Sequence, residues 1–135
     1  MKVEEHEKAY EEHKRNIDRS IEEGIEENQR NIAYNISQGS VELFAIFLHK
    51  LKFIAGSGDQ FDHRIFKSVQ LIKKKIPYIF PGRKVILELM RKIEDERNAL
   101  CYGSRKSLDR IEKLIKNFNE LRDIINKELK NAIKE

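Results

Sequence analysis

Residues 108–125 read LDRIEKLIKNFNELRDII, and this stretch decides the fold. Its apolar side chains recur at steps of three and four residues, at Leu108, Ile111, Ile115, Phe118 and Ile125, with Arg122 in phase and Leu114 and Leu121 beside them. This spacing places them on one face of an α-helix, because an α-helix repeats every 3.6 residues. The pattern predicts a long amphipathic helix over about residues 105–133.

The N-terminal half has the same helical periodicity in two segments. A first helix is predicted over about residues 2–27, with a thin apolar stripe whose gaps are filled by His6, His13 and Gly24. Such a stripe suits packing against one neighbouring helix or a partner subunit. A second helix, over about residues 30–55, contains the most apolar stretch, Val41 to Ile54. We expect a kink at Gly39-Ser40, and the glycines of the segment 55–59 are expected to end the helix.

Two more helices are predicted in the middle of the chain. One starts at Asp62, which is a suitable N-cap, and runs to Lys75. The segment 76–82 contains two prolines, which disfavour helix, so it is predicted to be an apolar loop that packs onto the bundle. The other helix covers about residues 83–101 and is broken by Gly103.

These segments predict an all-α, antiparallel up-and-down bundle of about five helices. The 135 residues fit a single domain, 1–135, with a leading helix in 1–28 and the main bundle in 30–134. Glycine (6) and proline (2) are too scarce for the turns of an all-β fold. The 37% of charged residues is typical of helices with one face in water.

The charge is distributed unevenly along the chain. Residues 1–27 contain ten acidic and five basic residues, whereas residues 28–135 contain thirteen acidic and twenty-two basic ones. The basic main bundle can attract phosphate polyanions, although scattered lysines also serve simply as a solvated surface. Charge alone leaves both interpretations open.

Cysteine content and hydropathy predict a cytoplasmic protein. Cys101 is the only cysteine, so no internal disulfide can form. The N-terminus is too polar for a signal peptide, and no apolar run approaches the roughly 18 residues of a membrane span. We therefore expect no membrane partner.

No pattern in the sequence predicts a metal or a cofactor. His6 and His13 are separated by two helical turns, about 10 Å, which is too far to bind one ion. Paired Glu-x-x-His motifs of a di-iron bundle are missing, and so are a nucleophile motif and a Gly-rich phosphate loop. His49 and His63 are isolated in the sequence and are expected to be partly buried or surface residues.

The stretch EDERNALCYG, residues 94–103, has two interpretations. In the simpler one, Arg97 forms an ion pair with a carboxylate such as Glu94 on the helix surface, a contact of a few tenths of a kcal/mol. In the other, Arg97 and its neighbours form a binding or catalytic site.

A resemblance favours the second interpretation. The run 96–102, ERNALCY, at the end of the penultimate helix resembles the signature of the HEPN (higher eukaryotes and prokaryotes nucleotide-binding) superfamily: Arg, a polar residue often Asn, a few variable residues, then His. The layout over about residues 30–125 is also similar: an apolar second helix, a Gly-containing loop, residues 61–66 (FDHRIF) opening a short third helix, and a long helix carrying the motif.

This resemblance implies a helical bundle that forms a homodimer, with the motifs of two subunits facing each other in a cleft. Many members of the superfamily are metal-independent endoribonucleases, often toxins paired with a nucleotidyltransferase antitoxin. Arg97 and Asn98 match the motif, and they are the expected phosphate- or nucleotide-binding residues. Tyr102 stands where the motif has His, and Gly103 and Ser104 offer no substitute.

The exchange of His for Tyr102 bears on catalysis. Cleavage of RNA through its 2′-hydroxyl needs a proton-transfer group that titrates near neutrality, whereas the pKa of tyrosine is ordinarily about 10. Phosphate binding by Arg97 and Asn98 does not need this group. On a continuous helix Arg97 and Tyr102 point about 140° apart, so they share a cleft only if the helix breaks near Cys101 or a second subunit contributes.

Three functional hypotheses follow. The first is a HEPN-like homodimer that binds RNA or a nucleotide through Arg97 and Asn98, is catalytically weakened or inactive, and works with a nucleotidyltransferase-type partner. The second is an active metal-independent endoribonuclease toxin with Arg97 and Tyr102 as catalytic residues. The third is a non-enzymatic bundle whose acidic first helix docks on a basic protein.

Overall fold

The computed structural model describes residues 2–55 and 61–134, and no strand occurs in these ranges. The elements in chain order are α1 (Val3–Glu23), α2 (Gln29–Lys50), the 3₁₀-helix η1 (His63–Lys67), α3 (Val69–Lys75), α4 (Arg83–Cys101) and α5 (Leu108–Lys134). The predicted all-α bundle of about five helices is confirmed.

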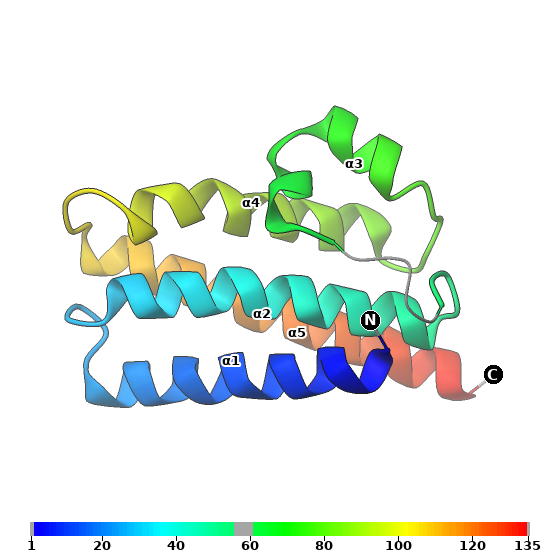
Figure 1. Ribbon diagram of the computed structural model, residues 1–135, viewed down its shortest axis with the longest axis horizontal. Coiled ribbons are helices and arrows are strands. Elements are labelled where there is room, and N and C mark those ends of the chain that lie inside the picture. Colours follow the sequence, from blue (N-terminus) through cyan, green and yellow to red (C-terminus); the bar gives the residue numbers. More distant parts are fainter. Residues whose placement is uncertain (1, 56–60, 135) are drawn as a thin grey trace.

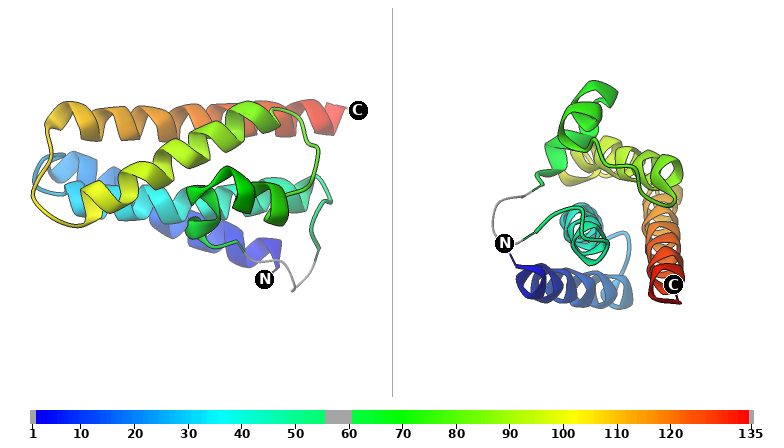
Figure 2. Two further views of the ribbon diagram at one scale, coloured as in Figure 1. Left: turned by 90° about the horizontal axis from the view of Figure 1, so that it is seen from above. Right: turned by 90° about the vertical axis from the view of Figure 1, so that its right-hand side faces the viewer.

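The four long helices run alternately in opposite directions, so the bundle is up-and-down and antiparallel (Figure 1). α2 lies in the middle, with α1 on one side and α4 on the other, and α5 packs against α2 and α4. The short elements η1 and α3 lie outside α4, on the side of the molecule opposite α1 (Figure 2). α1 and α3 are therefore on opposite faces.

The core is built around α2, because this helix is apolar on nearly all sides. Fifteen of its residues are buried, which fits a helix enclosed by neighbours. Phe44 at its centre has ring contacts with Phe61, Phe66 and Phe80, with centroids 5.6 to 5.7 Å apart. These aromatic contacts attach the segment between α2 and α4 to the bundle.

α1 packs chiefly on α2 and contributes a single buried apolar side chain, Ile17, to the described core. Polar contacts fill the gaps in its stripe: His6 Nδ1 lies 2.6 Å from Glu42, and His13 Nδ1 lies 2.9 Å from Asn35. α2 continues as one helix through Gly39 and Ser40. A Cβ at Gly39 would lie 3.3 Å from His13 Cβ, so this glycine allows α1 and α2 to approach closely.

Two predicted helix ends were wrong. α1 ends at Glu23, four residues early, because Gly24 takes φ of 143° and its N–H caps the carbonyl of Ser20. α2 ends at Lys50. Lys52 then adopts a left-handed conformation (φ 65°), and the N–H of Phe53 donates a hydrogen bond to the carbonyl of Leu48. The glycine loop expected to end α2 falls mostly at 56–60, outside the described residues.

The segment 62–75 is two helices and not one. Asp62 caps η1 as predicted, since its side chain accepts a hydrogen bond from the Arg64 N–H. Ser68 then adopts an extended conformation (φ −139°), and its hydroxyl caps α3 through the Leu71 N–H. In the following loop, Phe80 packs into the core as expected. No helix in the described residues is long and apolar enough to cross a membrane.

Candidate functional site

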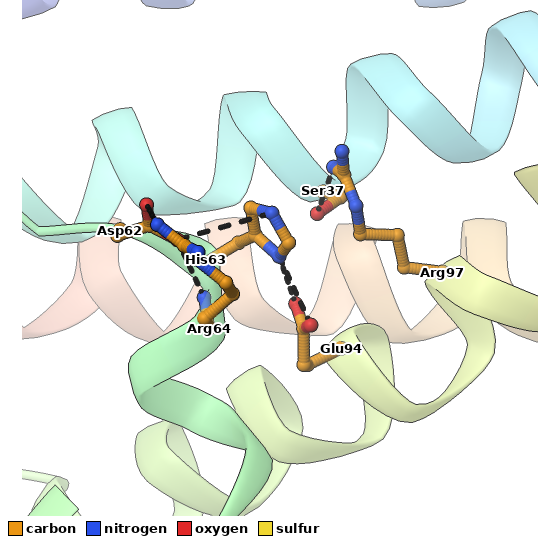
Figure 3. A network of polar contacts seen from close by, with 6 residues as sticks. All are labelled: Ser37, Asp62, His63, Arg64, Glu94 and Arg97. Atoms are coloured by element: carbon orange, nitrogen blue, oxygen red, sulfur yellow. Dashed lines mark hydrogen bonds and ion pairs between the residues drawn. The ribbon is translucent and has the colours of Figure 1, made fainter. Parts of the chain in front are cut away.

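The side chain of Arg97 is buried between α4 and α2. It lies one turn before the end of α4 with only 6% of its surface exposed. Its Nη1 donates a hydrogen bond to Ser37 Oγ at 3.0 Å (Figure 3), and its guanidinium carbon lies 5.3 Å from the ring centroid of Tyr34. Two residues of α2 therefore position the guanidinium, one by a hydrogen bond and one by a cation–π contact.

The interpretation of Arg97 as a surface ion pair was wrong. The nearby acidic side chains have other partners: Glu94 contacts His63, and Glu96 binds Arg110. Among the described residues, Arg97 has no ion-pair partner, and only its Nη1 has a hydrogen-bond acceptor. The 6% of Arg97 that is exposed leaves part of this residue in contact with solvent. A mostly buried cation without an anion is unusual and favours binding of an anion from outside.

A second polar pair lies one helical turn away. Nδ1 of His63 lies 2.9 Å from both carboxylate oxygens of Glu94, whose side chain is 2% exposed (Figure 3). Because a carboxylate only accepts hydrogen bonds, Nδ1 is the donor and Nε2 points away from Glu94. Nε2 lies 3.8 Å from Asp62, and hydrogen bonds from Arg64 lower the pKa of Asp62 to about 2.

Sequence reasoning treated His63 as isolated and did not predict this pair. Its partner is 31 residues away, so the contact arises from tertiary packing and has no local signal. The sequence does contain a signal for the burial of Glu94 and Arg97. Glu94 and Arg97 are in phase with the apolar stripe of α4, between Ile93 and Leu100, and that phase indicates burial.

Asn98 and Tyr102 are at the surface. Asn98 is exposed on α4, and Tyr102 is 63% exposed directly after the helix. α4 ends at Cys101 because Tyr102 is extended (φ −128°) and Gly103 takes φ of 83°. The break required for Arg97 and Tyr102 to share a cleft is therefore present. The structure gives no hydrogen bond or ring contact between these two side chains within the described residues.

Further arginines surround the end of α4. Arg30, in the first turn of α2, donates a hydrogen bond to the carbonyl of Gly103 at 2.7 Å. Arg105 binds the carbonyls of Glu26 and Glu27. A shallow pocket of about 230 Å³ lies here, lined by Glu27, Asn28, Arg30, Asn31 and Arg105. Arg30 and Arg105 thus lie at the same end of the bundle as Arg97, next to the turn that carries Glu26 and Glu27, and Tyr34 and Tyr102 are exposed.

Several of these charged groups influence the pKa of the Cys101 thiol. Burial raises the pKa of its thiol, Arg97 opposes this increase, Glu94 adds to it, and Arg30 opposes it again. A half-buried thiol with a raised pKa is a poor nucleophile, so Cys101 is not a catalytic candidate.

The described residues contain no group of three or more His, Cys, Asp or Glu side chains placed to hold a metal ion. Comparisons with models of known families, with curated proteins and with solved structures found no match to this chain. The resemblance to the HEPN superfamily therefore rests on the residues of the chain alone.

Proposed function

We propose that this chain is a HEPN-like protein that binds RNA or a nucleotide through Arg97 and Asn98 and has little or no ribonuclease activity. The observation that carries the proposal is the buried Arg97 guanidinium, which is held by Ser37 and Tyr34 and has no carboxylate partner in the described residues. A phosphate supplies the missing negative charge and accepts the unused N–H donors of the guanidinium fork.

The surroundings of Arg97 support a nucleic-acid or nucleotide ligand. Asn98 is exposed next to it and can donate a hydrogen bond, while Arg30 lies at the same end of the bundle. The exposed rings of Tyr34 and Tyr102 offer faces on which unpaired bases can stack. Phosphate contacts give affinity, and aromatic stacking favours single-stranded over double-stranded RNA.

The proposed protein is a cytoplasmic homodimer with the two Arg97 sites facing each other across a two-fold axis. The exposed Tyr34 and Tyr102 beside the site give such an interface aromatic contact area. A nucleotidyltransferase-type partner belongs to the same proposal. In the toxin pairs that partner modifies a tyrosine two residues after the motif His, and that position is Ser104 here, which leaves Tyr102 as the nearest tyrosine.

Fluorescence anisotropy with labelled single-stranded RNA tests the binding proposal. Arg97→Ala is expected to weaken binding about tenfold to a hundredfold, since charge-assisted hydrogen bonds to phosphate are lost. Arg110→Ala is the matched control, because it removes an exposed arginine that is paired with Glu96 and should change affinity less than about twofold. Equal affinities of wild type and Arg97→Ala, with no salt dependence in either, would instead support the protein-interaction bundle.

One observation favours the second candidate function, a metal-independent endoribonuclease. His63, oriented by the buried Glu94 one turn from Arg97, is a proton-transfer group of the kind that Tyr102 does not provide. In this candidate Arg97 stabilises the charge that develops on the phosphate, with Tyr102 as a weak acid.

Cleavage of structured RNA by the purified protein tests this candidate. Wild type, Arg97→Ala, Tyr102→Phe and His63→Gln are compared on one gel, with metal chelated. An active enzyme loses about a hundredfold or more in rate on removal of its general acid or base. Identical background cleavage by wild type and Arg97→Ala would rule out the enzyme while leaving the binding proposal intact.

A further inference from the structure

A basic surface lies around η1, α3 and the start of α4. Residues 63–87 contain seven lysines and arginines and no aspartate or glutamate. We define the α3 surface as its exposed lysines and exposed aliphatic side chains. They are Lys67, Lys73, Lys74, Lys75 and Lys84, with Val69, Leu71, Ile79 and Val85. These residues come from η1, α3, the following loop and the first turn of α4.

The aliphatic side chains of the α3 surface are exposed to water. Ile79 is 87% exposed on a loop between two prolines, and Val69, Leu71 and Val85 are each exposed by 40% or more. Figures 1 and 2 show α3 projecting from the bundle beyond α4. A groove of about 410 Å³ continues this surface between α3 and α4. Its lining combines Val69, Ile72 and Leu87 with four cationic side chains, Lys73, Arg83, Lys84 and Arg91, and one carboxylate, Glu88. Apolar side chains grouped among lysines indicate an interaction surface.

We infer that the α3 surface binds to the surface of an anionic lipid bilayer, with Ile79 entering the headgroup region and the lysines contacting the headgroups. Lysines near the surface are attracted to anionic lipids, and partly exposed aliphatic side chains add apolar contact below them. Surface binding needs no spanning helix, so the proposal revises the sequence-based expectation of no membrane partner. It does not depend on the function proposed for Arg97.

Two features favour lipid over RNA as the occupant. The segment has no freely exposed aromatic ring on which bases could stack: Phe66 and Phe80 are buried, and Tyr78 packs against Phe53. Its arginines already have partners within the protein, because Arg64 binds Asp62 and Arg83 binds two backbone carbonyls. The remaining charges are lysines, which suit a diffuse layer of headgroups.

The charge distribution of the whole molecule also suits a surface of negative charge. α1 contains eight acidic and four basic residues and lies on the face opposite α3 (Figure 2). An anionic bilayer attracts the α3 face and repels the α1 face. The protein therefore has one favoured orientation on such a surface.

Co-sedimentation with vesicles of phosphatidylcholine, alone or with one third phosphatidylserine, tests the inference. Wild type is expected to bind only the vesicles with phosphatidylserine. Replacing Lys73, Lys74 and Lys75 with glutamate should lower binding at least about a hundredfold. The matched control replaces Lys116, Lys127 and Lys130, exposed lysines of α5, with glutamate and should lower it far less.

A second pair of variants tests the apolar contact. Ile79→Ser should weaken binding roughly tenfold. Ile133→Ser, which changes an 82% exposed isoleucine on α5, should have no effect. Both side chains are so exposed that neither change threatens folding. Arg97→Ala should bind vesicles as wild type does, so a failed RNA-binding proposal is distinguishable from a failed lipid proposal.

Three results would overturn the inference. The first is equal binding of wild type to both kinds of vesicle. The second is equal loss with the two lysine triples, which would mean that net charge alone acts. The third is binding to single-stranded RNA that depends on the α3 lysines but not on Ile79, with no binding to vesicles, which would assign the surface to nucleic acid.

Discussion

Replacing Arg97 with methionine should stabilise the protein while it abolishes anion binding. Methionine is also long and flexible, so it can occupy the space between α4 and α2 that the arginine stem fills. The change removes a positive charge that is 6% exposed and has no ion-pair partner in the described residues. A more stable variant that no longer binds anions would show that Arg97 serves binding and not folding.

The change in the free energy of unfolding is the difference between a gain and a loss. Burial of an unpaired charge costs several kcal/mol, and methionine relieves this cost. The hydrogen bond to Ser37, about 1.5–3 kcal/mol for a charged donor, and the cation–π contact with Tyr34, about 1 kcal/mol, are lost. Ser37 can then donate to a backbone carbonyl one turn earlier in α2, so its hydroxyl is not left unpaired. The net gain should be about 1 kcal/mol.

For a chain of this length, about 1 kcal/mol corresponds to roughly 3.5 °C in Tm. Thermal unfolding followed by circular dichroism measures the shift, and anisotropy with single-stranded RNA measures binding on the same samples. We expect a higher Tm together with an affinity about tenfold to a hundredfold lower. A Tm lowered by more than about 3.5 °C would refute the reasoning, because Arg97 would then hold the helices together.

Three more predictions concern the packing around the site and the acidic helix. His63→Ala should lower the free energy of unfolding by about 3 kcal/mol, because the 2% exposed Glu94 loses its partner. Urea denaturation of this variant, of Glu94→Leu and of the double variant should show that the two losses are not additive; additive losses would contradict the pairing. Gly39→Val should cost about 1–3 kcal/mol in the same assay, since even a Cβ would lie 3.3 Å from His13, and an unchanged midpoint would show that α1 can move away. Burial raises the pKa of the Cys101 thiol, so iodoacetamide at mildly alkaline pH should alkylate the folded protein more slowly than the urea-unfolded chain, and equal rates would contradict the raised pKa.

The glycines on either side of α4 predicted both of its ends. α4 occupies Arg83–Cys101 as predicted, because Gly82 and Gly103 both adopt positive φ at its ends. The end of α2 could not be predicted in this way. Lys52 takes a left-handed conformation that glycine usually occupies, and the hydrogen bonds of the cap offset its strain.

The candidate site was predictable in part. The motif resemblance singled out Arg97, and the phase of α4 could have indicated its burial, yet the sequence alone also allowed an ion pair with Glu94. In the structure Glu94 does not pair with Arg97, because its carboxylate contacts His63 of η1. Ser37 and Tyr34 were not identified, since their approach to Arg97 depends on how α2 crosses α4.

The break at Ser68 explains how His63 reaches Glu94. In a 3₁₀-helix residues three apart share a face, so within η1 His63 lies on the same side as Phe66, which is 1% exposed and packs on Phe44. A continuous α-helix from residue 63 to 75 would place the buried residues 66 and 72 about 120° apart, and both could not face the bundle equally well. The extended Ser68 turns α3 so that each element buries its own apolar residue. The same break therefore holds His63 against α4 and directs the lysines of α3 outward.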